Sequence, residues 1–372
     1  MCEKKYRSVY SLEDCRSFYQ GKKVLVTGHT GFKGTWLCRI LLMAGARVTG
    51  YSLNPPTEPS LFHLLDMEHS GIQSIYGDIR DKEHLEKVFQ EEEPEIVFHL
   101  AAQPIVLESY QDPVYTYETN AMGTVYLMEC VRKTPSVRSV LNVTTDKVYE
   151  NKEWEYGYRE CDPLDGHDPY SNSKSCSELI THSFIKSFFQ DRECSISTAR
   201  AGNVIGGGDF AANRIVPDCV RAMEAGEKIH VRNPYSTRPY QHVLEPLFMY
   251  LQIAHWQYGT KDYQGYYNVG PDDCDCVTTG ELVDLFCSQW GEPAAWTDWS
   301  SNMGKMPHEA NFLKLDCSKI KKEFQWQPRW HMKQAIQKTV EWSKAYLNGE
   351  DLKEVTDRQI AEYAKTLVET IK

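Results

Sequence analysis

Two short segments of the sequence carry side chains suited to acid–base chemistry on a hydroxyl group. Tyr170 and Lys174 form a YxxxK pattern just after Pro169, and one helical turn brings both side chains onto one face. A cation close to a phenol favours the phenolate, which can accept a proton. Tyr19 and Lys23 show the same spacing by chance, before the first predicted strand. The prediction therefore depends on where the second pair lies.

The second segment, TTDK, ends a predicted strand with Thr145, Asp146 and Lys147. An acid and a base side by side can move two protons on one face of a substrate, as the elimination of water requires. A surface ion pair is the simpler alternative. Because the strand bearing TTDK precedes the helix bearing Tyr170, we expect the two segments to meet at one edge of a sheet.

The segment TGHTGFKG, residues 27–34, follows the first strand and opens the first helix. Gly28 permits a tight turn, Gly31 lets the backbone approach a pyrophosphate, and Gly34 allows close helix–strand packing. This context predicts dinucleotide binding. An acid that would hold the ribose is expected about 20 residues on, but residues 51–54 read YSLN. The choice between NAD and NADP stays open at this motif, although the missing arginine favours NAD.

An oxidised nicotinamide adds a second positive charge beside Tyr170. Lowering a phenol pKa from about 10 to about 7 requires roughly 4 kcal/mol, which Lys174 and the nicotinamide together can supply in a dry cleft. Asp78, at the end of the third strand, is predicted to contact the adenine, with a helix N-cap as the alternative.

The composition excludes several other classes of function. Of 372 residues, 41% are hydrophobic and 25% charged, and the net charge of −11 argues against nucleic acid and anionic membranes as partners. Any anionic substrate must then meet a few local cations. The charged N-terminus lacks the apolar core of a signal peptide, and no stretch is apolar enough for a membrane span, so we expect a cytoplasmic protein. The twelve cysteines are scattered without a CxxC pair, which favours reduced, packed thiols and no metal.

From residue 22 to about 200, short apolar runs alternate with segments of helical period, which predicts a doubly wound α/β fold with a parallel sheet. We expect a Rossmann domain over 19–203 with a returning segment at about 238–270. After residues 206–208 the rhythm fails and Pro, Tyr and Trp become frequent. We assign 204–237 and 271–350 to a smaller substrate lobe, and 351–372 to a helical tail for packing or oligomer contacts.

These motifs resemble those of the extended short-chain dehydrogenase/reductases, and within them the CDP-glucose 4,6-dehydratases of deoxysugar and O-antigen biosynthesis. The resemblance runs from about residue 21 to residue 349. It includes the segments GKKVLVTGHTGFKG, PSLF, GDIRD, PEIVFHLAAQP, TNAMGTV, TTDKVYEN, GYRE, DPYSNSKSCSEL, RAGNVIGGGDF, RNPYSTRPYQHVLEP and PHEANFLKLDCSK. It implies tightly held NAD, CDP-glucose as substrate, and a homodimer or homotetramer.

Carried over by position, the resemblance implies roles for individual residues. The catalytic residues are Thr145, Asp146, Lys147, Tyr170 and Lys174. Cofactor contacts, besides Tyr170 and Lys174, are Gly28, Thr30, Gly31, Phe32, Lys33, Gly34, Asp78, Ile79, Leu100, Ala101, Ala102 and Thr119. Substrate contacts are Gln103, Asn203, Arg232, Arg238 and His308, the arginines suiting a diphosphate. His99 is assigned a structural role. One departure is QPIVLESY in place of the family's QPLVRxSY, which puts Leu107 and Glu108 where a basic residue is usual.

Alternatives remain at this point. A 4-epimerase or reductase on the same fold would need the tyrosine, lysine and cofactor but no acid–base pair after Thr145. A non-catalytic NAD-binding regulator would need none of these side chains, and another nucleotide hexose remains possible as substrate. Within a dehydratase, we expect burial to keep Asp146 protonated as the acid, with Lys147 either a neutral base or a charged stabiliser of an enolate.

Overall fold

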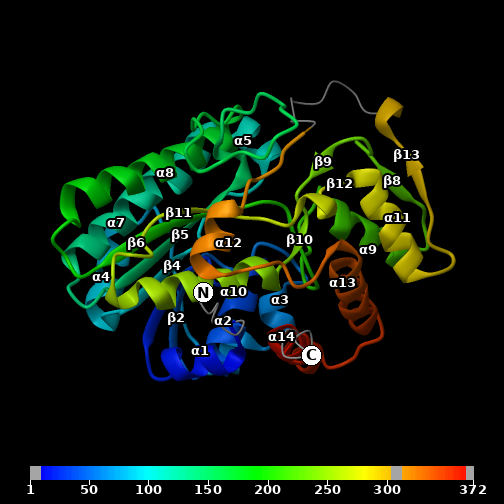
Figure 1. The fold of residues 1–372 in the computed structure, drawn as a ribbon. Helices are drawn as coiled ribbons and strands as arrows, with labels where there is room; N and C mark the ends of the chain where they lie inside the picture. The colour runs from blue at the N-terminus through cyan, green and yellow to red at the C-terminus, as the bar shows by residue number, and fades with distance from the viewer. Residues whose placement is uncertain (1–9, 303–311, 366–372) are drawn as a thin grey trace, which may run out of the picture.

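The computed structural model describes residues 10–302 and 312–365. Its centre is a seven-stranded parallel sheet with the order β11-β6-β5-β4-β1-β2-β3 (Figure 1). The strands are β1 (Lys23–Thr27), β2 (Arg47–Ser52), β3 (Gln73–Tyr76), β4 (Ile96–His99), β5 (Ser139–Thr145), β6 (Ser195–Ala201) and β11 (Tyr266–Val269). The strand order reverses between β1 and β4, where doubly wound sheets bind ligands. The predicted fold class is confirmed.

The central strands are apolar because both faces of the sheet are covered. Val24 and Val26 of β1 pack into the hydrophobic core on one face, and Leu25 between them packs into the core on the other. Successive side chains of a strand point to opposite faces, so a continuous V/L run is what a doubly covered strand requires. Because this burial holds the strands in place, it also determines the edge of the sheet at which the TTDK segment lies.

Helices cover both faces of the sheet (Figure 1). One face carries α4 (Lys82–Glu92), α7 (Gly123–Lys133) and α8 (Pro169–Phe188), and the other carries α1 (Leu12–Tyr19), α2 (Phe32–Met43) and α10 (Leu244–Trp256). Shorter helices are α3 (Leu61–Leu64), α5 (Val106–Gln111), α6 (Pro113–Tyr117) and α12 (Ser318–Phe324). A π-helical turn, Glu118–Met122, joins α6 to α7. The segment 238–270 returns α10 and β11 to the sheet.

The second lobe is built from three two-stranded ladders and a layer of helices. The ladders pair β10 (Gln241–His242) with β7 (Val204–Ile205), β12 (Val277–Thr278) with β9 (Thr237–Arg238), and β13 (Trp296–Asp298) with β8 (Ile229–Val231). The helices are α9 (Ile215–Ala225), α11 (Thr279–Trp290) and α13 (Met332–Leu347), which enclose their own hydrophobic core. Strands of two or three residues have no periodicity to detect, which is why the sequence pattern fades here.

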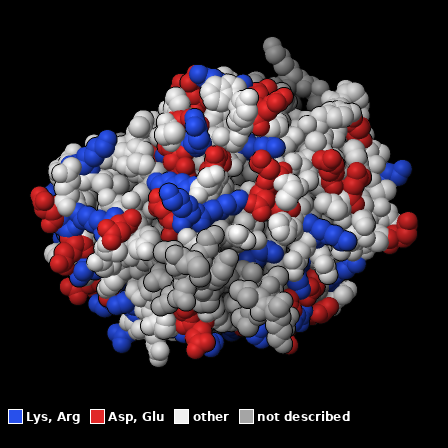
Figure 2. All heavy atoms as spheres, viewed as in Figure 1, with Lys and Arg blue, Asp and Glu red and all other residues white. Residues whose placement is uncertain are grey.

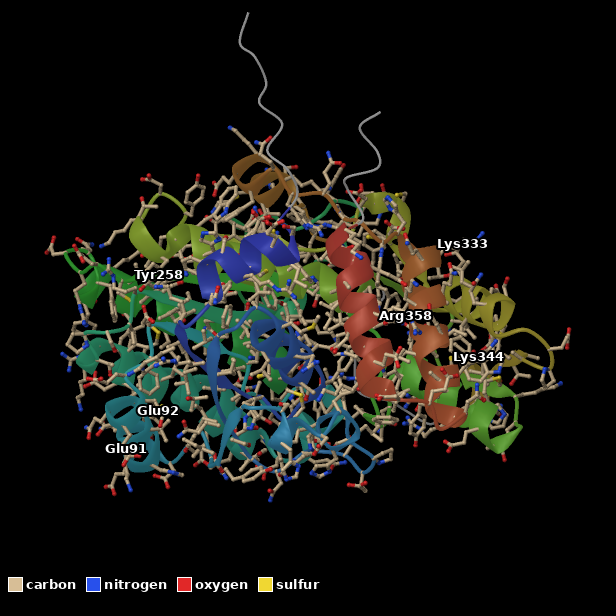
Figure 3. All side chains as sticks on the ribbon, turned by 90° about the horizontal axis from the view of Figure 1, so that it is seen from below. Glu91, Glu92, Tyr258, Lys333, Lys344 and Arg358 are labelled. Atoms are coloured by element: carbon tan, nitrogen blue, oxygen red, sulfur yellow. The ribbon has the colours of Figure 1, made fainter. Side chains whose placement is uncertain are left out.

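The C-terminal helix α14 (Leu352–Lys365) packs on the main body. Figure 3 shows α14 beside α13, and Arg358 of α14 forms an ion pair with Glu341 of α13 at 3.1 Å. At the other end of α14, the Tyr363 hydroxyl donates to Glu245 of α10 at 2.8 Å. Helix α14 therefore covers the hydrophobic core on the face of the sheet that carries α1, α2 and α10.

The surface carries charges of both signs. Figure 2 shows Lys and Arg interspersed with Asp and Glu over the face in view, rather than gathered into one patch. Within the described residues no helix is long and apolar enough to cross a membrane. Each cysteine that the structure describes is a free thiol.

Candidate active site

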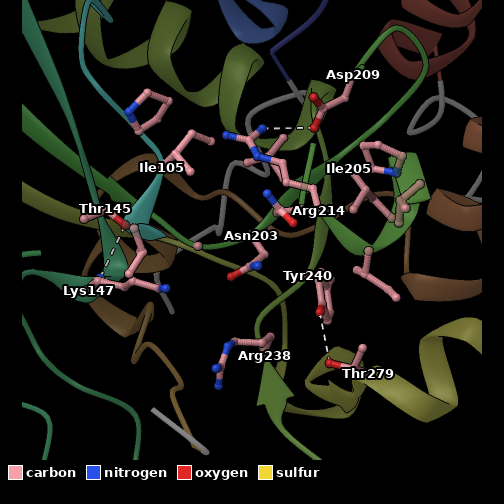
Figure 4. Close-up of a pocket in the computed structure, with 18 of the residues that line it drawn as sticks. Ile105, Thr145, Lys147, Asn203, Ile205, Asp209, Arg214, Arg238, Tyr240 and Thr279 are labelled. Carbon is pink, nitrogen blue, oxygen red and sulfur yellow. Dashed lines mark hydrogen bonds and ion pairs between the residues drawn. The ribbon is translucent and has the colours of Figure 1, made fainter. Parts of the chain in front are cut away.

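A cavity of about 640 Å³ lies between the carboxyl ends of β5 and β6 and the second lobe (Figure 4). Its lining includes the cations Lys33, Lys147, Arg214, Arg232 and Arg238, and the acids Asp146 and Asp209. Cations outnumber acids here although the whole chain carries a charge of −11. The cavity is therefore suited to an anionic ligand, as the composition led us to expect.

The TTDK segment turns into this cavity at the end of β5. Thr145 donates from Oγ1 to Oδ1 of Asp146 at 2.9 Å and accepts from the Lys147 backbone N–H at 3.4 Å. Asp146 is only 2% exposed, and its second oxygen, Oδ2, has no hydrogen-bond partner among the described residues. Burial raises the pKa of Asp146, against the opposing charges of Lys147 and Arg238. The side chain is thus suited to hold a proton.

The YxxxK pair enters from the start of α8. Asp168 caps this helix by accepting from the Ser171 N–H at 2.9 Å, which fixes Tyr170 in the first turn. Burial raises the pKa of Tyr170 to about 12, although a hydrogen bond with Thr145 and the charge of Arg214 lower it. A Tyr170 pKa near 7 therefore requires the positive charge of an oxidised nicotinamide, because burial outweighs the other effects in the protein itself.

Lys174 lies one turn further along α8 and is 4% exposed. Its Nζ donates to the carbonyl of Val143 in β5 at 3.3 Å. Burial, together with the charge of Lys33, lowers the pKa of Lys174 to about 7, while Glu178 opposes the shift. Lys174 does not line the cavity itself; it lies behind Tyr170, between helix and sheet.

The glycine turn fits a dinucleotide. Gly28 has φ +76°, and a Cβ there would lie 2.7 Å from the Ala101 nitrogen; a Cβ on Gly34 would lie 2.0 Å from the Gly28 oxygen. Gly31 is the N-cap of α2 and offers no capping side chain, so the first amides of the helix remain available to an anion. Phe32 and Lys33 of that first turn line the cavity. The hydroxyl of Thr119, in the π-turn, is buried without a partner in the described structure. These features leave room and donors for the predicted cofactor.

The remaining cofactor candidates lie around the same sheet edge. Thr30 donates to the Leu53 carbonyl at 2.9 Å, just beyond β2. The backbone amides of Leu100 and Ala101 each lie 3.2 Å from the Thr27 hydroxyl, and Ala102 follows them at the end of β4.

Asp78 and Ile79 follow β3. Asp78 pairs with Arg80 at 2.7 Å, and Ile79 is buried and would meet a side chain added at Gly123. The alternative role of Asp78 as a helix cap is wrong, because Asp81 caps α4.

Three of the five predicted substrate contacts line the cavity: Asn203, Arg232 and Arg238. Arg232 also pairs with Asp218 at 3.1 Å. Gln103 does not line the cavity; its side chain is buried and bonded to the Thr116 hydroxyl at 2.9 Å and to the Ile105 N–H, so the geometry gives it a role in holding the backbone. His308 lies outside the described residues. His99 is buried and bonded to Thr27 at 2.8 Å.

Sequence reasoning missed two parts of the lining. Arg214 enters the cavity from the N-cap of α9 and forms an ion pair with Asp209 at 3.0 Å (Figure 4). Both follow the glycine run in a stretch with no periodicity, so only their charge marked them. Leu107, flagged as a departure from the family pattern, lies in the apolar wall of the cavity, whereas Glu108 is exposed.

One cluster of ligand-type side chains lies elsewhere, at Cys274, Asp275 and His331. The two oxygens of Asp275 bond to the Met332 N–H at 2.8 Å and to His331 Nδ1 at 2.7 Å. The arrangement is accounted for by capping the N-terminus of α13.

Comparisons with known proteins show the family and the fold of the chain. The family model for GDP-mannose 4,6 dehydratase matches residues 25–339. CDP-glucose 4,6-dehydratase from Salmonella typhimurium is 47% identical over 94% of this chain and 98% of its own. Among solved structures, UDP-glucose 4-epimerase from Thermotoga maritima, with UDP-glucose, has a TM-score of 0.75 at 22% identity, over 87% of this chain and 99% of its own. The dTDP-glucose 4,6-dehydratase of Bacillus anthracis, in complex with NAD, has a TM-score of 0.73 at 22% identity, over 89% and 99%. With a family model matched over most of its length and a 47% identical relative across nearly all of it, the chain belongs to the GDP-mannose 4,6 dehydratase family.

Proposed function

We propose that this protein is an NAD-dependent hydro-lyase that converts CDP-D-glucose to CDP-4-dehydro-6-deoxy-D-glucose and water. The observation that carries the proposal is Asp146: a buried carboxyl group, one of whose oxygens has no hydrogen-bond partner among the described residues, in the cavity that Tyr170 also lines. The relative with 47% identity, a CDP-glucose 4,6-dehydratase, supports CDP-glucose as the substrate.

The chain's own residues divide the proton transfers between them. Tyr170 takes the proton of the 4-hydroxyl, with Thr145 oriented against it by its bond to Asp146. Bound NAD supplies a hydride acceptor at C4 and a hydride donor to C6. The resulting ketone makes the C5 proton acidic. Asp146 then donates its proton to the departing 6-hydroxyl, which leaves as water, and Lys147 takes the proton from C5. As C6 receives its hydride, Lys147 returns a proton to C5.

We assign Lys147 the role of the base that removes the C5 proton. Its side chain enters the cavity in Figure 4 from the same strand end as Asp146. Adjacent residues at a strand end can serve one face of a sugar ring, which syn removal of water across C5 and C6 requires. If Lys147 instead stays charged, it stabilises the enolate and another group moves the proton.

The substrate diphosphate is assigned to Arg232 and Arg238, whose planar guanidinium groups suit bidentate phosphate contacts. Asn203 lines the same cavity, and Figure 4 shows it near Arg238. We further propose a homodimer or homotetramer acting in the cytoplasm, an assembly that size-exclusion chromatography with light scattering tests directly.

A 4-epimerase or reductase is the main rival. It needs Tyr170, Lys174 and the cofactor, but it has no use for a protonated Asp146 beside the reacting sugar. The deciding experiment incubates the protein with CDP-, dTDP-, UDP- and GDP-glucose and follows products by mass. Loss of one water from CDP-glucose supports the proposal. An isomer of unchanged mass supports an epimerase, and water loss from another nucleotide hexose alone changes the substrate.

A further inference from the structure

A fully buried ion pair lies behind the active site and has no part in the chemistry described so far. Glu178 of α8 and Arg200 of β6 are both 0% exposed, with Oε2 and Nη2 2.9 Å apart. Burying two ions carries a desolvation penalty that close geometry and further hydrogen bonds must offset. Such a pair is weak evidence for stability, and its better-attested use is to fix geometry. The contacts of this pair show what it fixes.

Glu178 connects the catalytic helix to the catalytic strand. It lies four residues after Lys174, on the same face of α8. Its Oε1 accepts from the Thr144 hydroxyl at 2.5 Å, and Thr144 directly precedes Thr145 at the end of β5. Its Oε2 also accepts from the Thr198 hydroxyl in β6 at 2.7 Å. Burial raises the pKa of Glu178, but Arg200, His182 and Thr144 outweigh it and hold that pKa far below its ordinary value.

Arg200 reaches the other end of the TTDK segment. Its Nη1 donates to the Tyr149 hydroxyl at 2.9 Å, two residues beyond Lys147. The Tyr149 hydroxyl in turn donates to Asn268 Oδ1 in β11 at 2.6 Å, which ties this end to the edge of the sheet. Tyr149 is 1% exposed, so no water replaces these bonds.

The segment from Thr144 to Tyr149 is thus fastened at both ends by one ion pair, and Thr145, Asp146 and Lys147, the residues of this segment with predicted catalytic roles, lie in between. We infer that Glu178 and Arg200, acting through Thr144 and Tyr149, form a clamp that holds Asp146 and Lys147 in register with the sugar while Tyr170 acts from α8. The inference rests on the proposed function. Its members are positioning residues, since none of these bonds involves a reacting atom.

The clamp predicts which step each variant impairs. Thr144→Val removes the bond at one end of the segment, and Tyr149→Phe removes the bonds at the other. Both should leave C4 oxidation, which Tyr170 and Lys174 carry out, close to the wild-type rate. Elimination of water should slow roughly tenfold or more, because small misplacements of reacting groups reduce rates steeply. The readout is a rapid-quench time course with CDP-glucose, in which the 4-keto hexose and the dehydrated product are separated by mass.

The chain offers a matched control for each variant. Thr198→Val removes a hydroxyl from the same carboxylate, but Thr198 lies outside the fastened segment. Tyr158→Phe removes a buried hydroxyl that bonds to the Lys152 N–H at 2.7 Å, from a ring stacked on Tyr149, without touching Arg200. Thermal unfolding of all four variants shows how much stability each lost bond supplied.

The inference is supported when only Thr144→Val and Tyr149→Phe accumulate the 4-keto hexose. The inference is overturned when the ratio of C4 oxidation to water elimination is unchanged in those two variants. It is also overturned when Thr198→Val changes this ratio equally, because the effect would then come from the charge of Glu178 or from stability. Failure of the wild-type protein to release water refutes the proposed function and the clamp's role in it. A working wild type with unaltered variants refutes the clamp alone.

Discussion

Replacing Asp146 by Asn separates its role as an acid from its role in packing. The amide has nearly the same shape, and its oxygen can still accept the Thr145 hydroxyl, which lies 2.9 Å from Oδ1. What the variant lacks is an acidic proton on Oδ2, the buried oxygen for which the described part of the chain offers no hydrogen-bond partner. We therefore expect the fold and substrate binding to persist while protonation of the departing 6-hydroxyl fails.

The size of the effect follows from the general acid role. Positioned general acids contribute roughly 10²- to 10⁴-fold, which corresponds to about 3–5 kcal/mol of transition-state stabilisation. The loss should fall on elimination and not on C4 oxidation, because Tyr170 handles the first proton. In a rapid-quench assay with CDP-glucose, Asp146→Asn should therefore accumulate the 4-keto hexose while forming dehydrated product at a rate reduced by that factor.

Asp146→Asn should slow the reaction but make the folded protein more stable. Because burial raises the pKa of Asp146, the folded protein holds this proton more tightly than the unfolded chain does. Stability is then lost as the pH rises above the ordinary aspartate pKa of about 3.9 and through the folded value. Asn removes that loss, so the variant should unfold at a higher temperature than wild type at neutral pH, with a difference that shrinks in acid. Dehydration within a few-fold of the wild-type rate would refute the acid role. A variant less stable than wild type at neutral pH would contradict the raised pKa.

Four further variants test the site and its surroundings. Tyr170→Phe should abolish most C4 oxidation with an unchanged melting temperature; a loss of only a few-fold would place the base elsewhere. Lys174→Ala should weaken NAD binding as well as turnover, since an ammonium behind the phenol can reach the nicotinamide ribose, and equilibrium dialysis with NAD would show unchanged affinity if this is wrong. Lys147→Ala should oxidise C4 but not eliminate water, and near-normal dehydration would exclude Lys147 as the base. Burial raises the pKa of Glu245 to about 7, so the folded protein loses roughly 3 kcal/mol of stability as the pH rises from the ordinary glutamate pKa near 4.3 to 7. Glu245→Gln should therefore raise the melting temperature at pH 8 but not at pH 4. Equal effects at the two pH values would contradict this.

The sheet was predictable because its strands are buried on both faces. The short apolar runs between residue 22 and about 200 correspond to the strands β1 to β6. The segment 113–133 is one continuous helical stretch, from α6 to α7. The π-turn within it left no mark in the sequence, although it buries Thr119 and Asn120. The helix α1 was also missed: it has only eight residues, half of them polar, and its buried Tyr19 donates from its hydroxyl to the Leu251 carbonyl in α10 at 2.7 Å. A contact 232 residues away along the chain has no local signal.

The identity of the chemical groups was predictable from spacing, but their ionisation was not. Tyr170 and Lys174 share a helix face by periodicity alone, and this suggested a phenol made more acidic by its lysine. In the structure the same burial that places Lys174 behind Tyr170 raises the phenol pKa to about 12 and lowers that of the lysine to about 7. Each shift disfavours a charge, so the pair is closer to neutral than the motif implies. Cations from distant segments, Lys33 on α2 and Arg214 on α9, also act on it. It follows that the YxxxK motif specifies which proton can move, whereas the surrounding lobes and the bound cofactor set the pH at which it does.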